Sequence, residues 1–232
     1  MTIAYSARGA SGFGAAAALP LLALVLPLKT LVPAWTLIAL VAGTALLGSD
    51  RNKIVWAEVV KLLPGTIIGI ALGLYVFTML SADALAKWVG GFILAYGLYS
   101  LWTTFGAGAK PQLPARAAAL LGGFAGGMTG TVVGTMGSTF YAIYFDTIKL
   151  GKDGYRATMT AILLTLSLGR GVGYFAVGEF GRDVLMLTMV LLPSMLLGIF
   201  IGNRIHHGMS ETAFRRTVAC ALTVSGLALL IK

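Results

Sequence analysis

Long apolar runs constrain this chain more than any other feature. Of its 232 residues 58% are hydrophobic and only 11% are charged, whereas an ordinary soluble domain has roughly 25% charged residues. A bilayer core about 30 Å thick is crossed by about 20 predominantly apolar residues of helix. The sequence therefore predicts an all-α integral membrane protein with about eight hydrophobic segments. These lie near residues 5–27, 31–49, 56–80, 84–104, 116–148, 157–178, 183–203 and 213–231.

Several other classes of protein do not fit the sequence. The alternating ten-residue strands of a membrane β-barrel are absent. The first apolar run contains Arg8, and Pro20 and Pro27 lie where a signal peptide would be cleaved, so we interpret it as mature structure. The single cysteine, Cys220, excludes an internal disulfide and a cysteine-based metal cluster.

The net charge of +9 comes mostly from Lys and Arg residues scattered singly between the apolar runs. We interpret them as topology signals beside lipid headgroups, and we expect the bilayer but no nucleic acid as a partner. A homo-oligomer is left open. No GxxxxGK[ST] motif is present, so we expect transport driven by gradients or by a partner subunit. We expect no cofactor and no metal, since His206 and His207 have no third ligand at metal spacing.

The sequence contains an internal repeat. The segment LPGTIIGIALG at residues 63–73 recurs as LPSMLLGIFIG at 192–202, and the offset of 129 continues through the following segment. We expect two repeats of about four segments, residues 1–105 and 115–232, joined by a linker at 106–114. An even number of full crossings per half makes such repeats parallel, and a re-entrant segment in each half makes them inverted. The sequence leaves both arrangements and the membrane orientation open.

Residues 115–149 form an apolar run too long for one ordinary span, and glycines crowd its middle. Each glycine weakens a helix by roughly 1 kcal/mol relative to alanine, which favours a helix broken near its centre. The resuming half-helix would present backbone N–H groups to an anion. Close GxxxG packing of helices is the alternative interpretation. The predicted substrate-binding residues here are Gly130, Thr131, Gly134, Thr135, Gly137 and Ser138.

Two further places complete the predicted site. The opening RGASGFGAAAALPLL is the first-half counterpart of the glycine-rich run, and it is predicted to be a second broken segment. Arg170 lies in the apolar stretch LLTLSLGRGVGYF, where a charge is costly unless it faces a polar cavity or a partner. Glu179, a cluster of carbonyls or a bound anion could neutralise it, and snorkelling towards Glu179 is the alternative. The predicted substrate-binding residues are then Arg170 and, in the opening, Ser11, Gly12, Phe13 and Gly14.

The GFG-to-Pro opening, the glycine-rich second-half counterpart and the duplicated four-segment units resemble the sulfite exporter TauE/SafE family, also called TSUP. The similarity runs over nearly the whole chain. It departs from the usual pattern at Ala15 to Ala18 and at GTMGST, where such proteins often have Gly-Gly-Pro. The resemblance implies a multi-pass transporter that moves sulfite, sulfoacetate or related sulfonates across the cytoplasmic membrane. The residues alone imply only a small anion, bound near the midplane and moved by alternating access.

Two other functions remain open at this point. An anion channel could use the same broken helices to line a pore. An intramembrane serine protease would use the GxSG motif at residues 9–12, but it needs a histidine on another span. The only histidines are His206 and His207 in a charged loop. We therefore predict no catalytic residue and no enzymatic activity.

Overall fold

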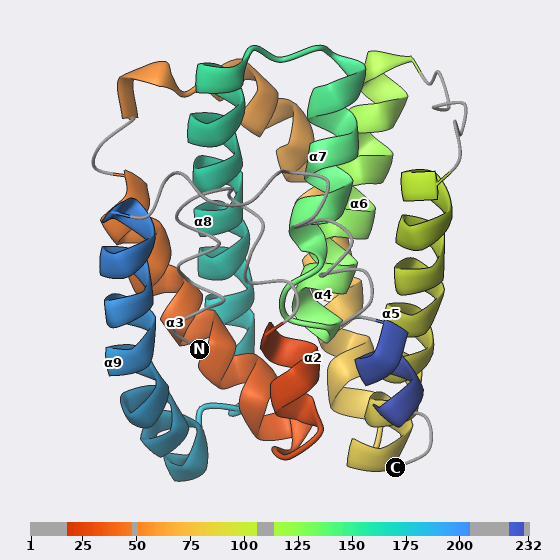
Figure 1. Cartoon of the computed structure of the whole chain (residues 1–232), viewed down its shortest axis with the longest axis vertical. Helices are drawn as coiled ribbons and strands as arrows, with labels where there is room; N and C mark the ends of the chain where they lie inside the picture. Colours follow the sequence, from red (N-terminus) through yellow and green to blue (C-terminus); the bar gives the residue numbers. More distant parts are fainter. Residues whose placement is uncertain (1–17, 48–50, 106–113, 205–222, 230–232) are drawn as a thin grey trace. The chain divides into compact units, whose positions relative to one another are not determined.

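All the regular structure of the described residues is helical. The computed structural model describes residues 18–47, 51–105, 114–204 and 223–229 (Figure 1). The α-helical fold class predicted from the sequence is confirmed for this part of the chain. The helices are α2 (Ala18–Ala23), α3 (Leu28–Leu47), the short 3₁₀ helix η2 (Arg51–Lys53), α4 (Trp56–Met79), α5 (Ala82–Phe105), α6 (Ala115–Val132), α7 (Gly137–Thr147), α8 (Lys152–Ala176), α9 (Arg182–Arg204) and a last helical stretch at 223–229.

Three of the described helices are long and apolar enough to cross a membrane: α3, α4 and the part of α8 from Gly154 on. They correspond to three of the predicted segments. Large apolar side chains on α4 are exposed, among them Ile67 at 61% and Tyr75 at 60%. A surface of this kind suits lipid and not water. The chain is thus a multi-pass membrane protein.

Contacts between residues divide the chain into two compact units. The first unit comprises Met1–Leu31, Leu80–Pro111 and Pro193–Lys232, and the second comprises Val32–Met79 and Gln112–Leu192. Each unit draws on both predicted repeats. This division by contacts therefore differs from the division into the two predicted repeats.

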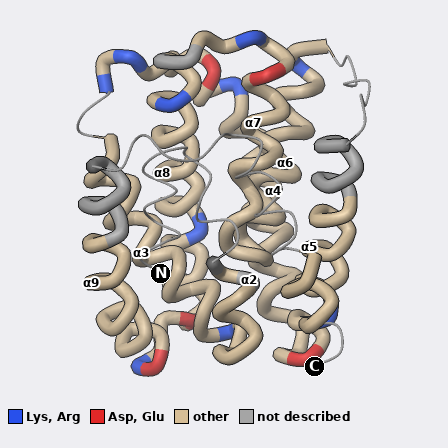
Figure 2. The backbone as a smooth tube through the Cα atoms, in the orientation of Figure 1, with Lys and Arg blue, Asp and Glu red and all other residues tan. Residues whose placement is uncertain are grey.

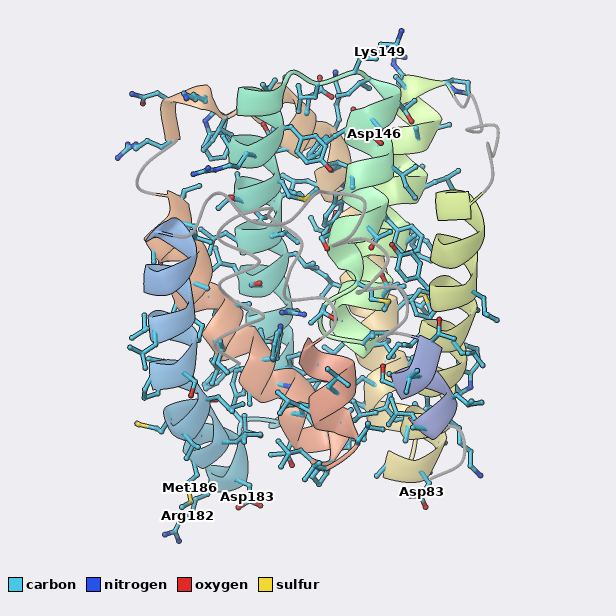
Figure 3. The ribbon with its side chains drawn as sticks, viewed as in Figure 1. Asp83, Asp146, Lys149, Arg182, Asp183 and Met186 are labelled. Atoms are coloured by element: carbon cyan, nitrogen blue, oxygen red, sulfur yellow. The ribbon has the colours of Figure 1, made fainter. Side chains whose placement is uncertain are left out.

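Most charged residues of the second unit that the structure describes gather at the ends of its helices, and Arg170 within α8 is an exception (Figure 2). Asp146 and Lys149 lie at one end, whereas Arg182 and Asp183 lie at the opposite end (Figure 3). A membrane protein places charges in this way because a charged side chain in the bilayer core is costly. The two ends therefore indicate the two membrane surfaces.

Helices α6 and α7 form an antiparallel hairpin in the second unit. A Cβ atom at Gly122 would lie 3.3 Å from the carbonyl oxygen of Phe140, and one at Gly126 would lie 2.6 Å from the ring of Tyr141. The chain reverses between Val132 and Gly137, and Figure 1 shows α6 and α7 side by side. The sequence predicted a helix that breaks and resumes at 116–148, and that prediction is not confirmed, because the interruption is a reversal. The predicted break in the first segment lies outside the described residues.

Glycines join α4 to α6 along a close contact. A Cβ atom at Gly65 or at Gly69 would lie 2.2 Å from a carbonyl oxygen of α6, and one at Gly123 would lie 2.4 Å from a carbonyl oxygen of α4. The two backbones touch because neither helix has side chains at these positions, as in small-xxx-small membrane contacts. The structure thus shows close helix packing at Gly65, Gly69 and Gly123, the last of which lies in the glycine-rich run for which packing was the alternative interpretation. We call this contact the glycine seam.

Candidate functional site

The hairpin turn, residues 133–136, is the centre of the candidate site. Helix α7 has 11 residues and is only about 16 Å long, too short to cross a bilayer core. Val133 is 2% exposed and Met136 is 1% exposed, and Gly134 has a φ angle of 88° that favours glycine. Irregular backbone at membrane depth is tolerated where protein covers it. The turn is therefore a buried reversal, and its hairpin is re-entrant.

Arg170 of α8 binds this turn directly. Its side chain is 2% exposed, and its Nη1 atom donates hydrogen bonds to the carbonyl oxygens of Gly130 and Gly134, the latter at 2.8 Å. The last carbonyls of a helix lack partners within the helix and carry a partial negative charge. Arg170 therefore caps the C-terminus of α6. Of the neutralising groups considered from the sequence, the structure shows the carbonyl cluster.

Tyr174 is a second donor from the same face of α8. Its fully buried hydroxyl donates a hydrogen bond to the carbonyl oxygen of Thr131 at 2.5 Å. Its ring packs edge-on against Phe77 of α4, with centroids 5.1 Å apart. Since Tyr174 follows Arg170 by four residues, both side chains lie on one face of α8. Together they hold three carbonyl groups at and beside the turn.

The N-terminus of α7 begins directly after the turn. Gly137 is the first residue of α7, and a Cβ atom there would lie 2.6 Å from the carbonyl oxygen of Gly126. The Ser138 hydroxyl donates to the carbonyl oxygen of Thr135 at 3.4 Å, and the Thr139 N–H donates to that of Met136 at 3.2 Å. A helix N-terminus carries a partial positive charge and suits an anion. Arg170 contacts the turn that leads into this end of α7 through the carbonyl oxygen of Gly134.

The other arm of the hairpin is held by polar contacts with α4. The Tyr144 hydroxyl donates a hydrogen bond to the Glu58 carboxylate, which Lys61 also contacts at 2.6 Å. Closer to the turn, the hydroxyls of Tyr141 and Thr66 lie 3.2 Å apart and share a hydrogen bond. Helix α7 is therefore fixed to α4 at two levels. These contacts position the N-terminus of α7.

The structure brings together the second-half residues of the predicted site. They lie in or beside the turn: Gly130, Thr131, Gly134, Thr135, Gly137, Ser138 and Arg170. The predicted first-half residues, Ser11, Gly12, Phe13 and Gly14, lie outside the described residues. Sequence reasoning missed Tyr174, although a hydroxyl four residues after a buried arginine was a usable signal.

The chemistry of this site is that of anion binding. Backbone N–H groups, hydroxyl groups and a guanidinium group are all hydrogen-bond donors, and two of these features also carry positive charge. Among the described residues, no group of three His, Cys, Asp or Glu side chains could hold a metal ion. These groups are of the kinds that anion sites use.

A comparison with family models gave one match. The sequence model described as "Sulfite exporter TauE/SafE" matches residues 1–229. No curated protein and no solved structure matched the chain. The match covers the first predicted repeat, all but the last three residues of the second, and every residue of the candidate site.

Proposed function

Since the chain belongs to the sulfite exporter TauE/SafE family, it is a membrane transporter of sulfur-containing anions, and we propose that it moves sulfite or a small sulfonate such as sulfoacetate. The proposed location is the cytoplasmic membrane. Both kinds of substrate present a pyramidal group of three oxygens on sulfur. Such a group accepts several hydrogen bonds, and charge-assisted bonds to it are the strongest.

The observation that supports the proposed site is the re-entrant hairpin with Arg170 against its turn. The guanidinium group holds the turn that leads into the N-terminus of α7. Arg170 is about 7 Å, five residues, from the midpoint of the span Gly154–Ala176. The anion binds to the N–H groups of the first turn of α7, and Arg170 keeps that turn in place and adds positive charge.

The proposed mechanism is alternating access. Because the glycine seam joins α4 of one predicted repeat to α6 of the other, the proposed motion is gating at hinges within the helices, which exposes the anion to one side at a time. Pro64 in α4 and Pro193 in α9 are repeat equivalents and the proposed hinges, because proline weakens the helix at its own position. A homo-oligomer is compatible with this mechanism.

Flux in proteoliposomes tests the proposal. The wild type should take up labelled sulfite or sulfoacetate with a rate that saturates as the anion concentration rises. Arg170→Ala removes the donor to two buried carbonyl groups, which costs about 3 kcal/mol and corresponds to a loss of about 100-fold in flux. Arg170→Lys keeps the charge but loses the planar fork, so its flux should be intermediate.

Arg156→Ala is the matched control, because Arg156 lies on the same helix but is exposed. Its flux should equal that of the wild type. Size-exclusion chromatography of each variant separates loss of transport from loss of folding. A folded Arg170→Ala protein with wild-type flux would overturn the site, and flux that rises linearly with concentration would favour the anion channel.

A further inference from the structure

Equivalent helices of the two repeats contact each other reciprocally in the first unit. A Cβ atom at Gly97 of α5 would lie 2.9 Å from the backbone nitrogen of Thr223. A Cβ atom at Gly226 would lie 2.6 Å from the backbone nitrogen of Leu94. At the repeat offset of 129, Gly226 is the equivalent of Gly97, and Thr223 is the equivalent of Leu94. The pairing of position 97 with position 94 thus occurs twice, once with the glycine from each repeat.

The second unit contains another such pair, α3 and α8. A Cβ atom at Gly43 would lie 3.0 Å from Leu164, and one at Gly171 would lie 3.7 Å from Thr36. At the same offset, Leu164 and Gly171 are the equivalents of positions 35 and 42. Written in first-repeat numbers, position 43 of α3 therefore contacts position 35 of its equivalent α8. Position 36 of α3 likewise contacts position 42 of α8. The two equivalent helices cross near equivalent positions.

Reciprocal contacts of this kind indicate a two-fold relation, and their order gives the direction of its axis. In both pairs, the residue number rises along one helix while it falls along the other, so the helices are antiparallel. A two-fold axis parallel to the helices would make equivalent helices parallel. The axis that relates each pair is therefore perpendicular to its helices, in the plane of the membrane.

The connections of the second unit follow the same rule. The segment at η2 lies beside the N-terminal end of α8, since the Val55 N–H donates to the Thr158 hydroxyl at 3.0 Å. Its repeat equivalent is the connection that follows the C-terminal end of α8 and contains Arg182. Lys53 and Arg182, which are 129 residues apart, therefore lie at opposite ends of one membrane-spanning helix.

From these contacts we infer that the two halves of the chain are an inverted repeat, with equivalent segments crossing the membrane in opposite directions. The re-entrant hairpin accounts for this arrangement. In this arrangement α3, α4 and α5 each take the chain across once, whereas α6 and α7 return it to the side from which they started. The chain therefore enters α8 from the side opposite to the one at which it entered α3.

Cysteine labelling in sealed vesicles tests this topology without any assay of transport. The chain's single cysteine, Cys220, is first replaced by serine. Lys53→Cys and Arg182→Cys are then made singly, because both side chains are exposed and stand at equivalent positions. A membrane-impermeant maleimide should label one of them from outside and the other only after permeabilisation. Inside-out vesicles should reverse the pattern.

Gly151→Cys is the control for the side of the membrane. Gly151 is exposed, has open space around it and precedes α8, so it should react from the same side as Lys53→Cys. Chromatographic profiles like that of the parent show which variants are folded. Labelling of Lys53→Cys and Arg182→Cys from the same side would overturn the inverted repeat in favour of a parallel one. Absence of anion flux would leave this result unchanged and would bear only on the proposed function.

Discussion

Helices α3 and α8 are equivalent at the 129-residue offset of the sequence repeat, and they share a threonine that bonds within its own helix. Residues 28–47 of α3 correspond to residues 157–176 of α8 at the offset of 129. Thr36 donates a hydrogen bond to the carbonyl oxygen of Val32 at 3.1 Å, and its equivalent, Thr165, donates to that of Ala161 at 2.9 Å. Both threonines satisfy their hydroxyls within their own helix, which is the usual arrangement in an apolar environment.

The two helices differ at the positions that contact the hairpin. Arg170 and Tyr174 of α8 donate to the carbonyl groups at and beside the turn. Their equivalents in α3 are Val41 and Ala45, which carry no donor. Both helices therefore have the threonine that bonds within its own helix, whereas of these two helices only α8 carries the donors that contact the turn. This difference places the donors of the proposed anion site on α8, in the second half of the chain.

The largest effect is expected for an arginine placed in α3 at the position equivalent to Arg170, which tests whether α3 can replace α8 in supporting flux. Val41 is 37% exposed on a membrane-spanning helix, so Val41→Arg places a charge towards lipid at a cost of up to about 3 kcal/mol. We expect a lower thermal midpoint and no recovery of flux when this change is combined with Arg170→Ala. Val41→Leu is the control and should leave both quantities unchanged. Recovered flux in the double variant would contradict a special role for α8.

A smaller effect is expected at Tyr174. Tyr174→Phe keeps the ring against Phe77 but removes the hydrogen bond to Thr131, a loss of about 1 kcal/mol. Flux should fall by about fivefold, since 1.4 kcal/mol corresponds to tenfold. Tyr75→Phe on α4 is the matched control, because Tyr75 is 60% exposed. Equal flux in the two variants would show that Tyr174 does not position the turn.

The smallest effect is expected where α3 and α8 cross. A Cβ atom at Gly171 would find Leu40 at 3.5 Å and Thr36 at 3.7 Å, which is ordinary contact. Gly171→Ala should therefore raise the thermal midpoint slightly, because alanine contributes up to about 1 kcal/mol more helix propensity than glycine. Gly69→Ala is the contrast, because its Cβ would lie 2.2 Å from the Phe124 carbonyl oxygen and overpacking costs about 1 to 3 kcal/mol. Similar thermal midpoints for the two variants would contradict the looser packing at Gly171 and the tighter packing at Gly69.

The positions of the long helices could be predicted from the sequence, because apolar length alone sets a membrane span. The predicted segments 56–80 and 157–178 agree with α4 and α8 within a few residues. The 129-residue repeat is visible in the sequence because it needs no gap, and its division of the chain stays a prediction. The relation between the repeats could not be read, because loop charges are balanced between the two sides and hydropathy carries no information on chain direction.

The reversal within residues 116–148 is the feature that hydropathy could not show. A turn in water is marked by polar residues or proline, but this turn is buried and reads Val-Gly-Thr-Met. The density of glycine correctly marked the place as unusual. Its glycines serve different ends, however: Gly123 packs in the seam, Gly126 makes room for Tyr141, and Gly134 forms the turn. Composition does not distinguish these uses.

The candidate site could be predicted in its members more fully than in its interactions. Arg170 was identifiable because an intramembrane charge is rare and functional. That it holds the end of α6 depends on the fold, which brings residues 130 and 170 together. Tyr174 was missed because a single tyrosine in an apolar helix is most often packing.

The glycine seam also has a consequence for leakage. Where Gly65, Gly69 and Gly123 bring the backbones of α4 and α6 into contact, no channel is left between the two helices for a water molecule with a radius of about 1.4 Å. A hydrated ion or a chain of waters cannot reach the turn along this face of the hairpin without separating the two helices. The seam thus blocks water and ions between α4 and α6, and any permeation route to Arg170 must follow another face of the hairpin.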